Sequence, residues 1–283
     1  MLNDGMNPEM SKQLQVVFDH SGFQADLHVQ SLRAELFDGP YEPTEEMAFN
    51  DSERVFLSPT DRWPRQLRGF SPSIEHGSIR AGKQELKTHR PLIWISGHAG
   101  RRNVSWVSTF SVDLIFHFRE LGFFDVAYAF CKRGRGQRYT PTSLMKGLII
   151  QILERHPSVA VKNVRRLSKH RFREVGRAER SGQKGQQSGH LVWALLEDLL
   201  RLIEVAPEFQ TRTVLLLIDR LDLCVSEEGF SVLSDFIPRL QDMSQKISRI
   251  QVMITTARLS PLGIPTLRKG PELLQAYGKK SHG

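Results

Sequence analysis

Two acidic residues follow the most apolar run of the sequence. Residues 214–218 are all apolar, Asp219 comes directly after them, and Asp222 comes three residues later. A short apolar run approached through a polar turn is typical of a strand buried on both faces of a parallel sheet. The acids then lie at the carboxyl edge of the sheet, where open α/β folds place their ligands. Such a carboxylate can hold a hydrated Mg²⁺ on a nucleotide phosphate; the alternative is an acid that only caps the next turn.

A second stretch has the residue types that bind phosphate. Residues 92–96 indicate a short buried strand, Gly97 and Gly100 lie in the turn after it, and apolar residues then recur at helical spacing as far as Phe118. Backbone N–H groups at a helix start bind anions, and glycines let the backbone approach the anion closely. The order strand, glycine turn and helix therefore predicts a phosphate-binding loop that faces the two acids.

Strands and helices alternate from residue 91 to residue 258. Further strands are predicted at 125–131 and 250–255, and further helices at 140–156, 191–205 and 230–240. This alternation predicts an α/β fold, with a parallel sheet, right-handed crossovers and helices on both faces. We expect this domain to span residues 89–260.

The two ends of the chain carry weaker signals. Residues 1–88 are predicted to be a partly disordered N-terminal region with short helices near Leu14 and at 31–37, because residues 35–61 hold eight acids, one base and several prolines. Residues 261–283 are rich in Pro, Gly and Lys and are predicted to form a flexible tail.

Composition places the chain among soluble globular proteins. Hydrophobic residues make up 40% of its 283 residues and charged residues 25%, with a net charge of +8. Cys131 and Cys224 are too few for a disulfide framework and are predicted to be reduced thiols. The sequence has no signal peptide pattern and no apolar run long enough to cross a membrane, so we expect an intracellular, cytoplasmic protein without membrane contact.

A basic tract covers residues 162–184. It holds nine Lys or Arg residues and two Glu residues, so it carries almost all of the net charge. One interpretation is a surface for phosphate or nucleic acid. The other is a solvated helix followed by a linker at 181–189, which is favoured because Phe172 is the one aromatic residue in the tract.

Four stretches together carry a family resemblance: 92–100, 127–131 with the helix at 144–153, 216–224, and 252–258. In this order they resemble the STAND class of P-loop NTPases, specifically NACHT-like domains of fungal proteins with a nephrocystin-like N-terminal region. The resemblance implies binding of ATP, ADP or GTP with Mg²⁺. It assigns Asp219 to the Mg²⁺ ion, Asp222 to catalysis, and a set of residues to the nucleotide: Gly97, Gly100, Asn103, Ser105 and Arg258.

The sequence departs from this family at the positions that hold phosphate. A working loop reads G-x-x-x-x-G-K-[ST], but Arg102, Asn103 and Val104 replace its last three residues, and Leu223 replaces the second acid after the strand. Ser105 comes one residue late, which turns its side chain by about 100° on a helix. Without the lysine, stabilisation of phosphoryl transfer is badly reduced.

We therefore expect a degenerate, non-hydrolysing nucleotide-binding module of a signalling or scaffold protein, with protein partners or self-association. Two alternatives stay open. One is a residual NTPase that uses Arg101 or Arg102 in place of the lysine. The other is a basic protein that keeps only the fold and binds nucleic acid through residues 162–184.

Overall fold

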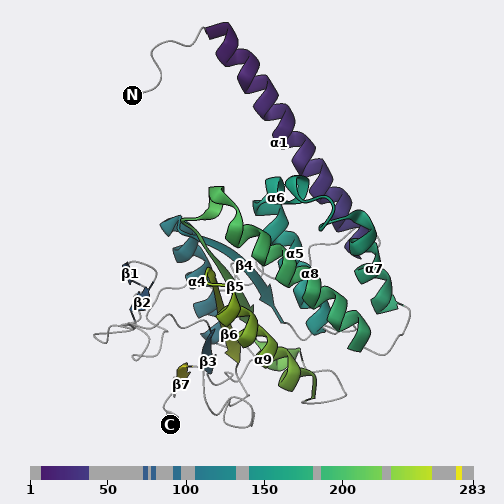
Figure 1. The fold of residues 1–283 in the computed structure, drawn as a ribbon. Helices are drawn as coiled ribbons and strands as arrows, with labels where there is room; N and C mark the ends of the chain where they lie inside the picture. Colours follow the sequence, from purple (N-terminus) through teal and green to yellow (C-terminus); the bar gives the residue numbers. More distant parts are fainter. Residues whose placement is uncertain are drawn as a thin grey trace. The chain divides into compact units, whose positions relative to one another are not determined.

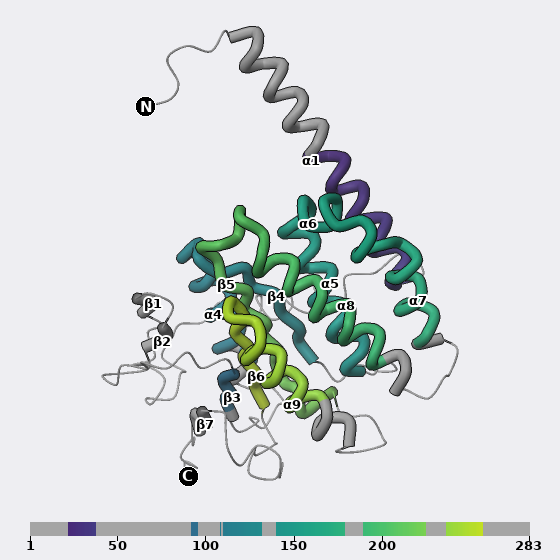
Figure 2. The backbone as a smooth tube through the Cα atoms, viewed as in Figure 1, coloured from purple at the N-terminus to yellow at the C-terminus, as the bar shows by residue number. Residues whose placement is uncertain are grey.

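The structure is a computed structural model of all 283 residues (Figure 1). It describes residues 8–37, 73–75, 78–80, 92–96, 106–131, 140–180, 186–224, 231–256 and 272–275. Figure 2 follows the backbone in the same view, coloured from the N-terminus to the C-terminus. The chain divides into two compact units. One contains Met1–Glu42 and Ile149–Ile203, and the other contains Pro43–Leu148 and Glu204–Gly283.

The second unit is built on a five-stranded parallel sheet in the order β4-β5-β6-β3-β7. The strands are β3 (Leu92–Ser96), β4 (Phe124–Phe130), β5 (Thr213–Asp219), β6 (Ile250–Thr256) and β7 (Glu272–Gln275). Strand β3, the first strand of this sheet along the chain, thus lies inside the sheet, while β4, which follows it, lies at an edge. The predicted parallel α/β fold is confirmed. Strand β7 is an addition that the sequence pattern after residue 260 did not predict.

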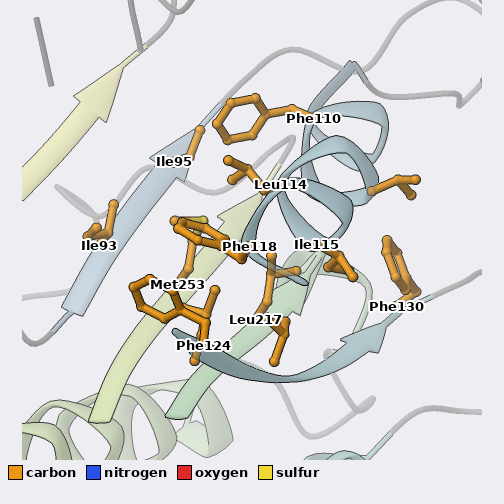
Figure 3. Close-up of a cluster of buried hydrophobic side chains, with 13 residues drawn as sticks. Ile93, Ile95, Phe110, Leu114, Ile115, Phe118, Phe124, Phe130, Leu217 and Met253 are labelled. Atoms are coloured by element: carbon orange, nitrogen blue, oxygen red, sulfur yellow. The ribbon is translucent and has the colours of Figure 1, made fainter. Parts of the chain in front are cut away.

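Helix α4 (Trp106–Leu121) covers one face of this sheet. Phe110, Leu114, Ile115 and Phe118 point from the helix toward the strands (Figure 3). They form a buried cluster with alternate residues of the strands: Ile93, Ile95, Phe124, Val126, Phe130, Leu215, Leu217 and Met253. The helix ends at Gly122, whose φ of +70° suits glycine and whose N–H donates to the Arg119 carbonyl oxygen.

The opposite side of the sheet is also buried, which explains why the strands are continuously apolar instead of alternating. Helix α9 (Ser231–Lys246) packs against β6 and β3 and lies on the other side from α4 (Figure 1). Trp94 in β3 is fully buried, and its indole Nε1–H donates to Thr256 Oγ1 at 3.0 Å. It is therefore a core residue of the buried strand that was predicted at residues 92–96.

Helix α5 (Pro141–Arg155) starts where its sequence signals indicate. Pro141 is its first residue, and Thr140 and Ser143 exchange backbone-to-side-chain hydrogen bonds of 3.0 and 3.1 Å. This reciprocal cap satisfies two N–H groups that a helix start leaves unpaired.

The first unit is helical. It contains α1 (Pro8–Phe37), the second half of α5, α6 (Pro157–Lys162), α7 (Lys169–Arg180) and most of α8 (Gln186–Val205). Helix α1 packs against α6 and α7. Its buried side chains recur at helical spacing: Ala25, Val29, Leu32 and Leu36. The sequence pattern predicted two short helices here, and the structure has one long helix.

Strands β1 (Ser73–Glu75) and β2 (Ser78–Arg80) form a small antiparallel pair. No helix in the described part of the chain is both long enough and apolar enough to cross a bilayer.

Candidate functional site

The candidate site lies at the carboxyl edge of the sheet, where β5 and β6 end beside the start of α4. Because β5 and β6 are parallel neighbours, Asp219 at the end of β5 comes next to Thr255 near the end of β6. Ser108 and Ser111 are three residues apart on α4, so both lie on the same side of that helix. Three segments distant in sequence thus direct small polar side chains to one point.

Asp219 is the centre of this arrangement. Its Oδ2 accepts a hydrogen bond from Ser108 Oγ at 2.6 Å. Its Oδ1 accepts two, from Ser111 Oγ at 2.8 Å and from Thr255 Oγ1 at 2.5 Å. The residue is 1% exposed, so both oxygens are occupied by protein donors and almost completely removed from solvent.

The environment of Asp219 shifts its proton affinity. Burial raises the pKa of its carboxyl group because the charged form loses its hydration. The three hydroxyl donors and the charge of Arg220 act in the opposite direction, and the net shift is upward. The hydroxyls therefore compensate only part of the cost of burying this acid.

The turn after β5 binds the second acid. Arg220 has left-handed backbone angles, φ 55° and ψ 46°, which turn the chain sharply into the short helix η3 (Leu221–Leu223). The Arg220 guanidinium contacts both carboxylate oxygens of Asp222 at 3.0 Å, and its backbone N–H donates to Thr255 Oγ1 at 3.1 Å. The two side chains are 6% and 2% exposed. Asp222 is thus one half of a buried ion pair.

Two thiols lie beside these acids. Cys131 follows β4, and its N–H donates to the Asp219 carbonyl oxygen at 3.0 Å. Cys131 and Cys224 are both free and buried. A hydrogen bond with Cys224 raises the pKa of Cys131 well above its usual range, and burial and the nearby carboxylates add to this effect. Because thiolates are the nucleophiles and metal ligands of proteins, the raised pKa makes Cys131 unsuited to either role.

The structure locates only part of the predicted site. It brings Asp219 and Asp222 to the expected edge of the sheet, within one turn of each other. The predicted nucleotide contacts lie outside the described residues: Gly97, Gly100, Asn103, Ser105 and Arg258.

The sequence reasoning missed the hydroxyl donors and the role of Arg220. One signal was present for Ser111, which occupies an apolar position of α4 between Val107 and Leu114. A hydroxyl on a buried helix face needs a buried partner, and Asp219 is that partner. Thr255, at the end of an apolar strand, is a similar signal.

A family model described as "Nephrocystin 3, N-terminal" matches residues 74–257, which is more than half of the chain. The chain belongs to the nephrocystin 3 N-terminal family. The matched region contains β3, β4, β5 and β6 and the whole Asp219 site. A search of curated proteins gave no match.

In this nephrocystin 3 N-terminal chain, the surroundings of Asp219 decide whether this acid could hold a Mg²⁺ ion. Mg²⁺ binds carboxylate and water oxygens in a regular octahedron and gives up its waters reluctantly. Each Asp219 oxygen already accepts at least one hydrogen bond from a protein hydroxyl, and the residue is only 1% exposed to the water that such an ion would retain. Among the described residues, no group of three or more His, Cys, Asp or Glu side chains is placed to hold a metal ion. The described residues therefore do not fit a Mg²⁺ ion on Asp219.

Proposed function

We propose that this chain is a non-hydrolysing member of the nephrocystin 3 N-terminal family, a NACHT-like module of a signalling or scaffold protein. In this proposal the parallel sheet of a nucleotide-binding fold is kept, and its catalytic acids serve the fold. The observation that carries the proposal is that both carboxylate oxygens of Asp219 accept hydrogen bonds from protein hydroxyls and that the residue is 1% exposed.

Asp222 supports the same conclusion. An acid that polarises an attacking water must have an oxygen available to that water. Both oxygens of Asp222 contact the buried Arg220 guanidinium, and Leu223 follows where the family has a second acid. The partners of both acids at the end of β5 thus support a structural role for them in place of phosphoryl transfer.

The sequence of the loop after β3 gives independent support. Arg102, Asn103 and Val104 stand where a phosphate-binding loop has Gly, Lys and a hydroxyl residue. The lysine and the hydroxyl residue would contact the phosphates and the metal ion, so their replacement agrees with the loss of a metal site at Asp219. The proposal therefore rests on two parts of the chain that lie more than 100 residues apart.

Calorimetric titration with ATP and GTP tests this function. Each nucleotide is titrated in Mg²⁺ and again in EDTA, into the native chain and into Asp219→Asn. If the native chain binds a nucleotide, we expect its affinity in Mg²⁺ and in EDTA to agree within a factor of about two. If it does not bind the nucleotide in EDTA, we expect no binding in Mg²⁺ either. A tenfold gain in affinity with Mg²⁺ that disappears in Asp219→Asn would overturn the proposal, because it would place the ion on this carboxylate.

A second arm restores the loop with Arg102→Gly, Asn103→Lys and Val104→Ser. New nucleotide binding by this variant would support a degenerate site on an intact fold. If the native chain already binds Mg²⁺-ATP as well as the restored variant does, the loop is not degenerate and the proposal is wrong.

A further inference from the structure

The first unit carries a group of exposed cations on and before α7. Arg165 and Arg166 lie in the turn between α6 and α7, and Lys169 and Arg177 lie on α7 itself. All four are exposed, and we call them the α7 basic surface. No ion pair within 4 Å joins any of the four to another described residue, but Lys169 and Arg177 are close enough to Glu35 to help lower the pKa of its carboxyl group.

Two other arginines of α7 are engaged in binding the helix to its own unit. Arg171 contacts Asp198 of α8 at 2.6 Å. Arg173 binds both carboxylate oxygens of Glu35 at the end of α1, each at 2.6 Å. These pairs connect α7 to α8 and α1, and α7 also packs against α1, so the basic surface belongs to a packed helix instead of a loose tail.

The apolar face of α7 is unavailable to any partner. Phe172 and Val175 are 0% and 1% exposed. A Cβ atom on Gly176 would lie 2.5 Å from the Glu35 carbonyl oxygen, which shows how closely α1 and α7 approach each other. The helix therefore cannot insert an apolar face into a membrane while this packing holds, and Phe172 cannot stack on a base.

The exposed face of α7 is polar throughout its described side chains. It consists of Lys169, His170, Arg173, Glu174 and Arg177. In the preceding segment, Val161 and Val164 are 45% and 48% exposed, and both are short aliphatic residues. Membrane-surface helices use larger anchors such as Trp, Phe and Leu beside their basic residues. A polyanion with regularly spaced charges suits this face better than a lipid bilayer does.

We propose that the α7 basic surface binds the phosphate backbone of duplex nucleic acid without reading its sequence. Lys169 and Arg177 are two helical turns apart, about 12 Å along the axis. A duplex strand carries one phosphate about every 3.4 Å along its axis, so this length covers three to four phosphates. Arginine, which provides three of the four cations, binds phosphate oxygens in a bidentate manner. This surface is in the first unit and does not depend on the proposed function of the Asp219 site.

Fluorescence anisotropy of the full chain with labelled duplexes of about 20 base pairs tests this proposal. Two unrelated DNA sequences and one RNA duplex are titrated over a range of NaCl concentrations. Four phosphate contacts predict a slope of log Kobs against log[salt] of about −3.6 on DNA, since each contact contributes about −0.9. We expect the affinities for the two DNA sequences to agree within about twofold. The RNA duplex shows whether the affinity differs between DNA and RNA duplexes.

The decisive variant is Arg165→Gln, Arg166→Gln and Lys169→Gln together. It should weaken binding at least tenfold and reduce the slope by about 2.7, for three lost contacts. The matched control removes three exposed cations elsewhere: Arg201→Gln, Arg239→Gln and Lys246→Gln. It makes the same change in net charge and should alter affinity less than threefold. Circular dichroism and thermal unfolding check that both variants are folded.

Three results would overturn the proposal. The first is equal weakening by both triple variants, which would mean that net charge alone drives binding. The second is no duplex binding at low salt. The third is that the chain binds vesicles that contain phosphatidylserine but does not bind duplexes, and that the triple variant of the α7 basic surface no longer binds the vesicles. This result would make the partner a membrane.

Discussion

Replacement of Asp219 separates a structural role of this acid from a catalytic one. In Asp219→Ala, the Thr255 hydroxyl, which is 0% exposed, loses its acceptor, and Ser111 loses its hydrogen bond to Asp219. A buried donor left without a partner costs about 1–3 kcal/mol, so the Ala variant should lose at least that much through Thr255. Ser108 is only half-buried and can turn to solvent. Asp219→Asn keeps one acceptor oxygen and removes the buried charge, so its free energy of unfolding should stay within about 1.5 kcal/mol of the native value.

Urea denaturation followed by circular dichroism measures both variants, because the midpoint and slope give the free energy of unfolding. The expected order is native and Asn close together, with Ala far below. A loss smaller than about 1 kcal/mol in the Ala variant would refute the hydroxyl network as a source of stability. A loss in Asn as large as in Ala would show that the negative charge itself is required, which is the property of a cation site.

Three further predictions concern residues around this site and in the helical unit. Because the pKa of Asp219 is raised, the folded protein holds the proton of this carboxyl group more tightly than the unfolded chain does. The contribution of Asp219 to the free energy of unfolding is therefore complete below its ordinary pKa of 3.8 and is lost as pH rises through the raised pKa. Asp219→Asn, which does not titrate, should therefore gain on the native chain as pH rises through that window, and a constant difference in unfolding free energy would contradict the shift. Asp222→Ala leaves the buried Arg220 guanidinium without its carboxylate and should lower the free energy of unfolding by about 3–5 kcal/mol. Adding Arg220→Gly, which suits the φ of 55° at this position, should restore most of the denaturation midpoint. A double variant no more stable than Asp222→Ala would contradict the pairing. Gly176→Ala should lower the free energy of unfolding by about 1–3 kcal/mol, because the new Cβ atom meets the α1 backbone. The control is Gly189→Ala in α8, where a Cβ atom meets nothing within 4 Å, and this change should be neutral or raise the free energy of unfolding by about 0.5–1 kcal/mol. Equal effects of the two variants in thermal unfolding would exclude a close approach of α1 and α7.

The strands were predictable because each is an apolar run with a polar boundary. Residues 214–218 and 252–254 have no alternation, and both faces of the sheet are indeed covered. The start of α5 at Pro141 and the end of α4 before Gly122 follow from local backbone chemistry, so both were also predictable. Strand β7 was not, because its four residues pair with β3 only through tertiary contacts.

The chemistry of the site was less predictable than the fold. A sequence motif identifies Asp219 as an acid at the end of a strand, but its role depends on what surrounds it in space. The three donors come from α4 and β6, up to 111 residues away in the sequence, and no local pattern links them to Asp219. The pairing of Asp222 with Arg220 likewise depends on the left-handed turn at Arg220, which an arginine does not signal.

The basic tract shows the same division. Its helical part was predicted, and α7 occupies Lys169–Arg180. The sequence could not show that Arg171 and Arg173 bind acids of α8 and α1 while Arg165, Arg166, Lys169 and Arg177 remain exposed. Only the packing of α7 separates cations that hold the fold from cations that can meet a partner.

Phosphate release from Mg²⁺-ATP and Mg²⁺-GTP by the purified chain is the most direct test of the claim that the β5 acids serve the fold and not hydrolysis. We expect the native chain to release phosphate no faster than buffer with Mg²⁺-nucleotide alone, and Asp219→Asn to give the same trace. Turnover by the native chain that disappears in a folded Asp219→Asn protein would contradict the account.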